Sequence, residues 1–195
     1  EYAIRALPPL VAKRPNIVYL VIGATHPAVQ RADGEMYRRF LENEVRRLGL
    51  HEHVRFYNKY LPLEEITEHL RATDVYIATA LGKEQSVSGT ISYALGCGRP
   101  VVSTRTAYAS YLISDDCGAL VGFRKPAEVA AAVERILADD KLRRDMSATA
   151  YAMTRKMAWP SVARSYFSLF RKLARIGAEE RKLPPIKFDH MIRFT

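Results

Sequence analysis

Short runs of consecutive apolar residues alternate along this chain with longer segments in which apolar residues recur at helical spacing. The runs predict buried strands at 17–22, 75–78, 101–103 and 119–121, and a further short strand is predicted at 54–57. The segments between them predict helices, most clearly at 36–48, 62–70, 89–95 and 126–137. Strands that alternate with helices pair in parallel and are covered on both faces. The sequence therefore predicts an α/β fold with a doubly wound parallel sheet.

The two ends of the chain follow other patterns. Only helical spacing is found from residue 141 to about residue 176, and Pro160 predicts a break that divides this stretch into two C-terminal helices. At the other end, 1–11 predicts a helix, although a strand should precede the first helix of a βαβ fold. We therefore expect a domain over 1–175 that lacks its first strand, and a tail over 176–195 that leads into a further region.

Composition limits the class of protein and of partner. The 195 residues suffice for one sizeable core, and no apolar run approaches the ~20 residues that span a bilayer. The formal net charge of +9 favours acidic partners such as nucleotide phosphates or lipid head groups, so peripheral membrane contact stays open. Neither a zinc-finger spacing nor an aromatic RNA-binding string supports nucleic acid as a partner. Cys97 and Cys117 lack metal-type spacing, which favours buried free thiols and a reducing, cytoplasmic location.

The segment 84–104 is the strongest candidate for a ligand site. A polar loop leads into a short helix near Ser88, Gly89 and Thr90, directly after a predicted strand. Ligands of open parallel sheets bind beyond the carboxyl ends of strands, and the unpaired N–H groups of a helix start favour phosphate. Gly89 allows close backbone approach, and Glu84 or Gln85 could bond sugar hydroxyls. The alternative is that Ser88 caps an ordinary helix.

The ending of this segment, Tyr-Ala-Leu-Gly-Cys-Gly-Arg-Pro-Val-Val-Ser at 93–103, resembles the nucleotide-sugar signature of family-4-type glycosyltransferases of the GT-B fold. Segments 16–23, 48–56, 72–75 and 125–130 resemble other parts of that family in the same order. The resemblance covers roughly residues 1–175. It implies the C-terminal, donor-binding domain, which is the Rossmann-like half of the GT-B fold.

The family signature contains two glutamates, which fall on Gln85 and Tyr93 here. In the family the first glutamate contacts sugar hydroxyls and the second holds the ribose. Gln85 keeps hydrogen-bonding capacity without charge, Tyr93 offers one hydroxyl instead of two carboxylate oxygens, and Glu84 lies one position early. A bacterial subgroup shares this pattern and also has segments similar to Gly-Ala-Thr-His-Pro at 23–27 and Gly-Glu-Met-Tyr-Arg at 34–38. In that subgroup a stretch like 183–190 leads into a further domain.

The resemblance implies a metal-independent, retaining transfer of a hexose from a UDP-sugar or GDP-sugar to a glycan or lipid-linked acceptor. The acceptor domain and the basic diphosphate ligands would lie outside this chain, so we expect the 195 residues alone to be inactive and assign no catalytic residue. No cofactor is implied. The alternatives are a noncatalytic nucleotide- or glycan-binding module, which the loss of both glutamates favours, and an epimerase of the same architecture.

Two loops supply further candidates for donor or acceptor contacts. His26 follows the first predicted strand and could bond a phosphate or an acceptor hydroxyl, or could equally be held by backbone groups. Tyr60 and Leu61 follow the second predicted strand, in the region that frames the base in the family. Tyr60 could stack on a base or pack in the core or on the surface. Adjacent acidic pairs such as Asp115-Asp116 diverge on a helix or turn, so they make poor acid–base pairs, and no metal-ligand pattern occurs.

Overall fold

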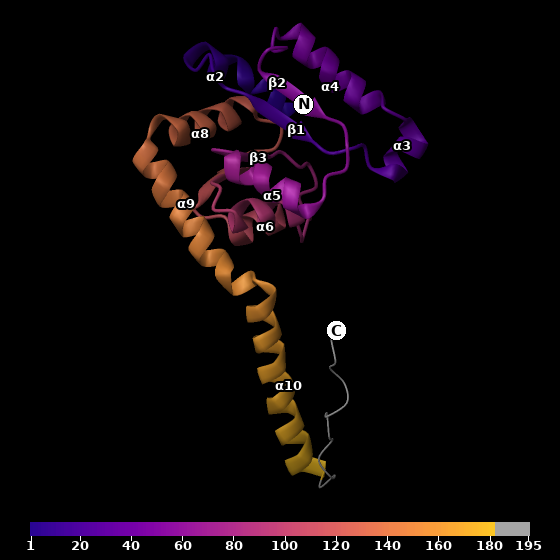
Figure 1. The fold of residues 1–195 in the computed structure, drawn as a ribbon, viewed down its shortest axis with the longest axis vertical. Helices are drawn as coiled ribbons and strands as arrows, with labels where there is room; N and C mark the ends of the chain where they lie inside the picture. Colours follow the sequence, from indigo (N-terminus) through magenta and orange to yellow (C-terminus); the bar gives the residue numbers. More distant parts are fainter. Residues whose placement is uncertain (182–195) are drawn as a thin grey trace. The chain divides into compact units, whose positions relative to one another are not determined.

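The computed structural model describes residues 1–181 of the chain (Figure 1). The chain divides into two compact units, Glu1–Met153 and Thr154–Thr195. This division lies before the expected boundary between 1–175 and 176–195, because the last long helix belongs to the second unit. The functional domain limits stay a prediction, and residues 182–195 of the expected tail lie outside the described part.

Helices and strands alternate through the first unit as the apolar pattern predicts. The strands are β1 (Tyr19–Ile22), β2 (Val54–Tyr57), β3 (Tyr76–Ala78), β4 (Val101–Thr104) and β5 (Gly118–Val121). The helices are α1 (Tyr2–Arg5), α2 (Leu7–Lys13), α3 (Pro27–Asp33), α4 (Met36–Arg47), α5 (Leu63–Ala72), α6 (Gly89–Gly96), α7 (Ala107–Leu112), α8 (Pro126–Ala138) and α9 (Asp140–Thr154). The predicted α/β class is confirmed.

All recorded strand pairs are parallel, as expected for strands joined by helices. Their hydrogen bonds form a two-stranded part, β1–β2, and a three-stranded part, β3–β4–β5. Tyr19 of β1 lies opposite Val54 of β2, and Val101 of β4 lies opposite Gly118 of β5. The sheet is thus parallel as predicted, although no backbone ladder joins its two parts within residues 1–181.

Strand β4 shows directly that the sheet is covered on both faces. All four of its residues are buried, and neighbouring side chains of a strand point to opposite faces. Val102 belongs to a core cluster with Leu7 and Leu10 of α2 and Val133 of α8. Val101 belongs to a second cluster, with α5 and α6. Figure 1 shows α8 and α5 on different sides of β3, which is the doubly wound arrangement.

Four short helices depart from the sequence prediction. The stretch 1–11 is helical as expected but is divided at Ala6, because α1 ends at Arg5 and α2 begins at Leu7. Pro8 and Pro9 lack the N–H groups that would continue the hydrogen bonds of α1. Helices α3 and α7 were not predicted. All side chains of α3 are exposed, so it carries no apolar stripe that the sequence could reveal.

The predicted break before Pro160 is confirmed. Helix α9 is followed by a 3₁₀ turn, η1 (Arg155–Met157), and Ala158 has an extended ψ of 138°. Helix α10 (Trp159–Arg181) then begins with Pro160 in its first turn, where a missing N–H costs no helical hydrogen bond. The two expected C-terminal helices are therefore α9 and α10.

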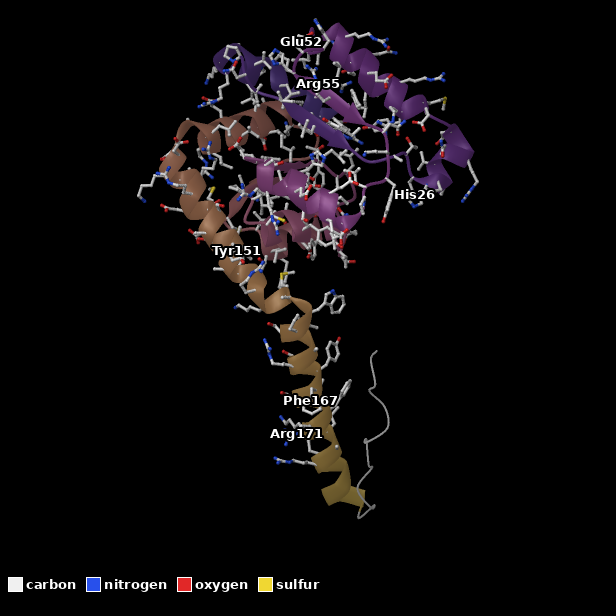
Figure 2. The ribbon with its side chains drawn as sticks, viewed as in Figure 1. His26, Glu52, Arg55, Tyr151, Phe167 and Arg171 are labelled. Carbon is white, nitrogen blue, oxygen red and sulfur yellow. The ribbon has the colours of Figure 1, made fainter. Side chains whose placement is uncertain are left out.

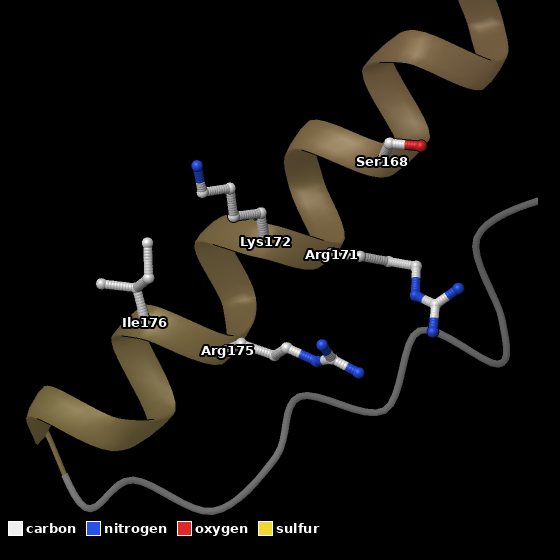
Figure 3. A pocket seen from close by; sticks show the side chains of 5 residues that line it. All are labelled: Ser168, Arg171, Lys172, Arg175 and Ile176. Carbon is white, nitrogen blue, oxygen red and sulfur yellow. The ribbon is translucent and has the colours of Figure 1, made fainter.

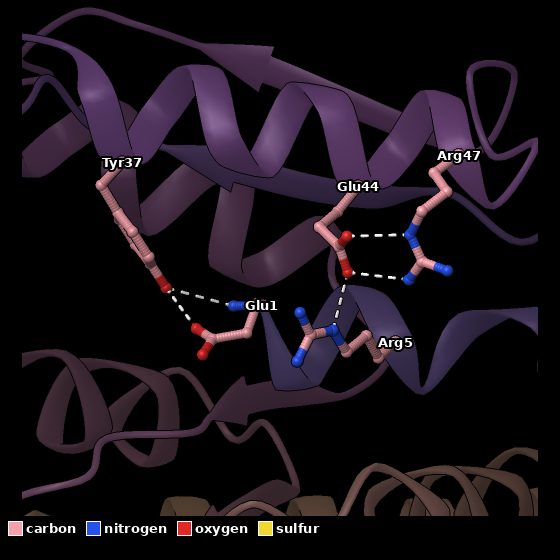
Figure 4. Close-up of polar contacts among 5 residues, drawn as sticks. All are labelled: Glu1, Arg5, Tyr37, Glu44 and Arg47. Carbon is pink, nitrogen blue, oxygen red and sulfur yellow. Dashed lines mark hydrogen bonds and ion pairs between the residues drawn. The ribbon is translucent and has the colours of Figure 1, made fainter.

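An ion cluster ties α1 to α4 (Figure 4). Glu44 accepts hydrogen bonds from Nε of Arg5 at 2.7 Å and from Nε and Nη2 of Arg47 at 2.9 and 3.0 Å. The hydrogen bonds from Arg47 and then Arg5 lower the pKa of the Glu44 carboxyl to about 2. The carboxylate is buried but doubly paired, which is the condition under which a buried charge is tolerated.

The two cysteines are free thiols, as the sequence predicts. Cys117 is fully buried in the second core cluster, whereas Cys97 is only partly buried.

Candidate functional site

Helix α6 starts at the carboxyl end of the loop that follows β3, as the sequence predicts. Ser88 is its N-cap residue, with extended backbone angles of φ −141° and ψ 104°. The Ser88 hydroxyl accepts from the N–H of Ile91 at 3.4 Å and lies 3.3 Å from the Thr90 hydroxyl. Ser88 thus performs the capping role given above as the alternative reading. That role leaves the next two N–H groups available for a ligand.

Gly89 and Thr90 present those two N–H groups. In the part of the chain that the structure describes, neither group donates to a protein acceptor, as is normal for the first turn of a helix. Both residues are exposed. A Cβ on Gly89 would meet only the ring of Tyr93, at 3.9 Å, so no protein atom requires glycine at this position. The helix start is therefore open to solvent and carries the positive end of the helix dipole.

Two side-chain contacts fix α6 against its neighbours. The Thr90 side chain lies near the hydroxyl of Tyr76 on β3; burial raises the pKa of Tyr76, and this polar neighbour lowers it by less. Two residues later, the Ser92 hydroxyl lies 2.5 Å from the hydroxyl of Tyr108 on α7 and donates to the carbonyl of Ser88 at 3.0 Å. These contacts set the direction in which the first turn of α6 points.

The loop before α6 is held by backbone contacts to β4 and α7. The Thr104 hydroxyl donates to the carbonyl of Ala80 at 2.6 Å. The N–H groups of Ala107 and Tyr108 donate to the carbonyls of Lys83 and Gln85 at 2.8 and 2.9 Å. The loop backbone is thus anchored at three points, while all side chains of 80–87 except that of Gln85 are exposed.

The three predicted sugar and ribose contacts lie on this anchored frame. Glu84 is exposed, Gln85 is half-buried, and Tyr93 is exposed one turn into α6, beside Gly89. In sequence, Gln85 precedes the Ser88–Thr90 turn at the helix start, and Tyr93 follows it. Their roles toward a ligand stay predictions.

The loop after β1 is organised by Glu35. The Glu35 carboxylate accepts from the Thr25 hydroxyl at 2.7 Å and from Nε of Arg38 at 3.2 Å. Arg38 also donates to the carbonyl of Gly23 at 2.8 Å, and Gly23 has a φ of 129° that favours glycine. The structure thus joins segments 23–27 and 34–38, which the sequence singled out separately.

His26 lies on this loop as the N-cap residue of α3 (Figure 2). Its Nδ1 accepts from the N–H of Ala28 at 3.2 Å, and the ring is exposed. A backbone group therefore holds one ring nitrogen, which corresponds to one of the two roles considered from the sequence. Nε2 is the ring nitrogen left for a ligand.

The loop after β2 places its two candidates in opposite environments. Tyr60 is 88% exposed, so it packs in no core, whereas Leu61 is 3% exposed and its side chain is buried. Only Tyr60 can offer a side chain to a ligand, and Leu61 can contribute only main-chain groups. Within residues 1–181, no recorded hydrogen bond or ring contact joins His26 or Tyr60 to the α6 start.

The sequence missed the residues that position the site. Tyr108 lies on a helix that was not predicted, and Glu35 and Arg38 were noted only for their resemblance to a subgroup. A local signal for α7 did exist, because Thr106 caps it by accepting from the N–H of Ala109 at 3.2 Å. The partners of Tyr108 and Glu35 depend on tertiary folding and have no local signal.

Two further kinds of feature, a metal centre and a membrane span, are absent from the described residues. No three His, Cys, Asp or Glu side chains gather there as metal ligands. Among the helices of residues 1–181, none combines the length and the apolar character of a membrane span.

The geometry can be compared with known proteins. Residues 1–139 match the family described as "Glycosyl transferases group 1". The chain is 30% identical over 177 residues to a phosphatidyl-myo-inositol mannosyltransferase of Mycolicibacterium smegmatis, which covers 88% of this chain and 41% of that relative. The chain thus spans about two fifths of the length of this curated relative.

Solved structures share the fold. The C-terminal domain of LpcC, a group 1 glycosyl transferase of Francisella tularensis, superposes with a TM-score of 0.67 at 21% identity, over 80% of this chain and 76% of that one. HepE of Anabaena, in complex with UDP-glucose, superposes with a TM-score of 0.69 at 22% identity, over 80% of this chain and 40% of that one. The fold is therefore the Rossmann-like half of a GT-B protein. The family match over residues 1–139 shows that the chain belongs to the group 1 glycosyl transferases.

Proposed function

We propose that the first unit binds a nucleoside diphosphate sugar as the donor domain of a glycosyltransferase. The observation that carries the proposal is the exposed start of α6, where two N–H groups have no protein acceptor among the described residues. A diphosphate is dianionic or more at neutral pH, so it suits both these donors and the positive helix end. The complex of the HepE fold with UDP-glucose supports the same class of ligand.

The roles within the site follow from position and chemistry. Gly89 and Thr90 hold the diphosphate through their N–H groups, and Ser88 keeps the first turn in place. Gln85, with Glu84 beside it, bonds hydroxyls of the donor sugar. Tyr93 bonds the ribose through its hydroxyl, and His26 and Tyr60 supply the outer contacts to phosphate and base.

The whole protein would transfer a hexose with retention of configuration to a glycan or lipid-linked acceptor. The bond from the sugar carbon to the diphosphate oxygen breaks, a new bond to the acceptor oxygen forms, and the acceptor proton passes to the departing diphosphate. The α6 N–H groups stabilise the charge that develops on the leaving diphosphate. No metal or cofactor takes part in this proposal, the acceptor domain lies outside this chain, and the protein is cytoplasmic.

Calorimetry with the 195-residue chain tests donor binding. UDP-glucose and GDP-mannose are titrated against the unaltered chain, Gly89→Ala and Gly89→Trp. Alanine at position 89 meets only ordinary contact with Tyr93, so binding should persist, whereas tryptophan should fill the approach to the helix start and abolish binding. Equal binding by Gly89→Trp would overturn the assignment of this site.

A noncatalytic module is the second candidate, favoured by Gln85 and Tyr93 where the family has glutamates. An activity assay separates the two functions. The 195 residues alone should transfer no sugar, whereas the chain joined to an acceptor domain should do so. Nucleotide binding without transfer in the joined protein would favour the module.

A further inference from the structure

A single carboxylate organises the loop that follows β1. The Glu35 carboxylate accepts hydrogen bonds from the Thr25 hydroxyl and from Nε of Arg38, and Gln30 adds a longer one at 3.3 Å. Arg38 donates onward to the carbonyl of Gly23, and its side chain is only 12% exposed. These contacts are made within the first unit, so they do not depend on what covers the loop in a longer protein.

The same contacts fix both sides of a short turn. Gly23 begins the turn at the end of the β1–β2 ladder, where its N–H donates to the carbonyl of Tyr57 at 3.0 Å. Its φ of 129° is one that residues with a side chain rarely adopt. Thr25 is held by Glu35, and α3 begins directly after His26. The backbone that carries His26 therefore lies between fixed points.

The cap of α3 also selects the tautomer of His26. Nδ1 of the ring accepts a hydrogen bond from the N–H of Ala28 at 3.2 Å, so the neutral ring carries its hydrogen on Nε2. In this tautomer Nε2 donates a hydrogen bond and has no lone pair with which to take up a proton. His26 thus suits a ligand oxygen that accepts hydrogen bonds, and it is unsuited to act as a general base through Nε2.

Two buried tyrosines connect the strand before this turn with the start of α6. Tyr19 is the first residue of β1, and Tyr76 is the first residue of β3. Burial raises the pKa of the Tyr19 hydroxyl to about 12, and the nearby hydroxyl of Tyr76 adds to this rise. Tyr76 in turn lies near the side chain of Thr90. Because loops after parallel strands leave the same edge of a sheet, the His26 turn and the α6 start serve one edge, which is where such sheets bind ligands.

We propose that Glu35 and Arg38 are positioning residues of the donor site, which hold the turn so that Nε2–H of His26 donates to a diphosphate oxygen. The proposal rests on the donor function proposed above and names the residues that set one of its contacts. Neither Glu35 nor Arg38 touches the donor. Glu35 acts through the Thr25 side chain, and Arg38 acts through the carbonyl of Gly23.

Calorimetry with UDP-glucose and the 195-residue chain tests the contact and its support. His26→Ser keeps an acceptor for the N–H of Ala28 but removes Nε2, so binding should weaken on the order of tenfold. Thr25→Val removes the hydroxyl that Glu35 holds and should weaken binding severalfold, whereas Thr25→Ser keeps a hydroxyl and should restore it. UDP should lose the same factor as UDP-glucose, because the contact is to the diphosphate.

A double-mutant cycle separates positioning from a general effect on the fold. If Glu35 acts through His26, Thr25→Val should weaken UDP-glucose binding little further in the His26→Ser background. Two factors that multiply would show that Thr25 acts independently of His26, and this result would overturn the positioning role. Thermal unfolding of the same variants measures how much stability each one loses.

Two controls address charge. Arg38→Met should weaken UDP-glucose binding because it releases the carbonyl of Gly23, whereas Arg39→Met removes the same charge from the next, exposed position of α4 and should leave binding unchanged. Arg171→Met with Arg175→Met alters the hollow on α10, whose cations offer an anionic nucleotide a second place to bind (Figure 3). This double variant should bind UDP-glucose as the unaltered chain does.

Gly89→Trp distinguishes failure of this proposal from failure of the donor site. Binding that Gly89→Trp abolishes, but that His26→Ser and Thr25→Val leave unchanged, would overturn the positioning role and keep the donor site at α6. Binding that survives Gly89→Trp would overturn both proposals, and its loss in Arg171→Met with Arg175→Met would place the nucleotide on α10. Absence of UDP-glucose binding by the unaltered chain would likewise overturn both.

Discussion

Nε of Arg5 lies 2.7 Å from a carboxylate oxygen of Glu44, so a residue of the first helix is fixed to one that follows 39 positions later. Arg47 holds the same carboxylate from its other side, within α4. The cluster thus anchors the N-terminal helices to the β1–β2 part of the unit, where Leu7 and Leu10 of α2 enter the core.

The Glu44 cluster gives the first prediction, which concerns pH. The folded-state pKa of Glu44 is about 2, below the usual value of 4.5. Its contribution to stability is therefore complete above pH 4.5 and is lost as the pH falls from there toward 2. Glu44→Gln should lower the melting temperature at pH 7 and should flatten its fall between pH 5 and pH 2. The exposed carboxylate of Glu52 provides the control, and Glu52→Gln should keep the unaltered acid profile.

The second prediction separates capping from ligand binding at Ser88. Ser88→Ala removes the acceptor for the N–H of Ile91 and should cost about 1 kcal/mol of unfolding free energy. Ser88→Asp keeps an acceptor and places a negative charge at the helix start, so stability should be retained while UDP-glucose binding weakens. Urea unfolding and calorimetry measure the two quantities. Undiminished nucleotide binding by Ser88→Asp would contradict the diphosphate site.

The third prediction concerns the contact between α6 and α7. Tyr108→Phe and Ser92→Ala each remove one hydroxyl of the 2.5 Å pair, and each should cost about 1 kcal/mol. Because the two hydroxyls bond to each other, the double variant should lose less unfolding free energy than the sum of the two single variants. A double-mutant cycle in urea measures this coupling. Strict additivity would show that the contact does not contribute.

The fourth prediction contrasts two glycines. A Cβ at Gly118 would overlap the carbonyl oxygen of Val101 and would lie 2.9 Å from Ile113, so Gly118→Ala should cost about 3 kcal/mol. Gly89→Ala meets only ordinary contact with the Tyr93 ring and should change stability by less than about 1 kcal/mol, since a first-turn alanine is well tolerated. Thermal unfolding of the two variants side by side provides the measurement.

The sequence predicted those elements whose apolar pattern carries enough information. Strand β1 was found from its continuous apolar run, and helices α4 and α8 were found from apolar stripes that face the core. Helix α3 was missed because no side chain of its seven residues is buried, so burial imposed no period on its sequence. The break between α1 and α2 could have been predicted from Pro8 and Pro9, but the apolar spacing across them masked it.

The candidate site likewise has one part that the sequence predicted and one part that it did not. The α6 start was predicted because the chemistry of a serine cap is local to Ser88 and the next three residues. The residues that orient this turn come from elsewhere, with Tyr76 on β3 and Tyr108 on α7. Such partners are chosen by the folded chain, so a single sequence contains no pattern from which to predict them.

Strand β4 contributes side chains to both hydrophobic cores of the unit. Because Val101 faces one core and Val102 the other, an opening that exposes its amides must breach both layers of helices at once. The β4 amides should therefore exchange with deuterium only through the largest opening that the unit undergoes, and their exchange rates should report its global stability. A substitution that destabilises the core on either face of the sheet should therefore change the exchange rates of the same β4 amides.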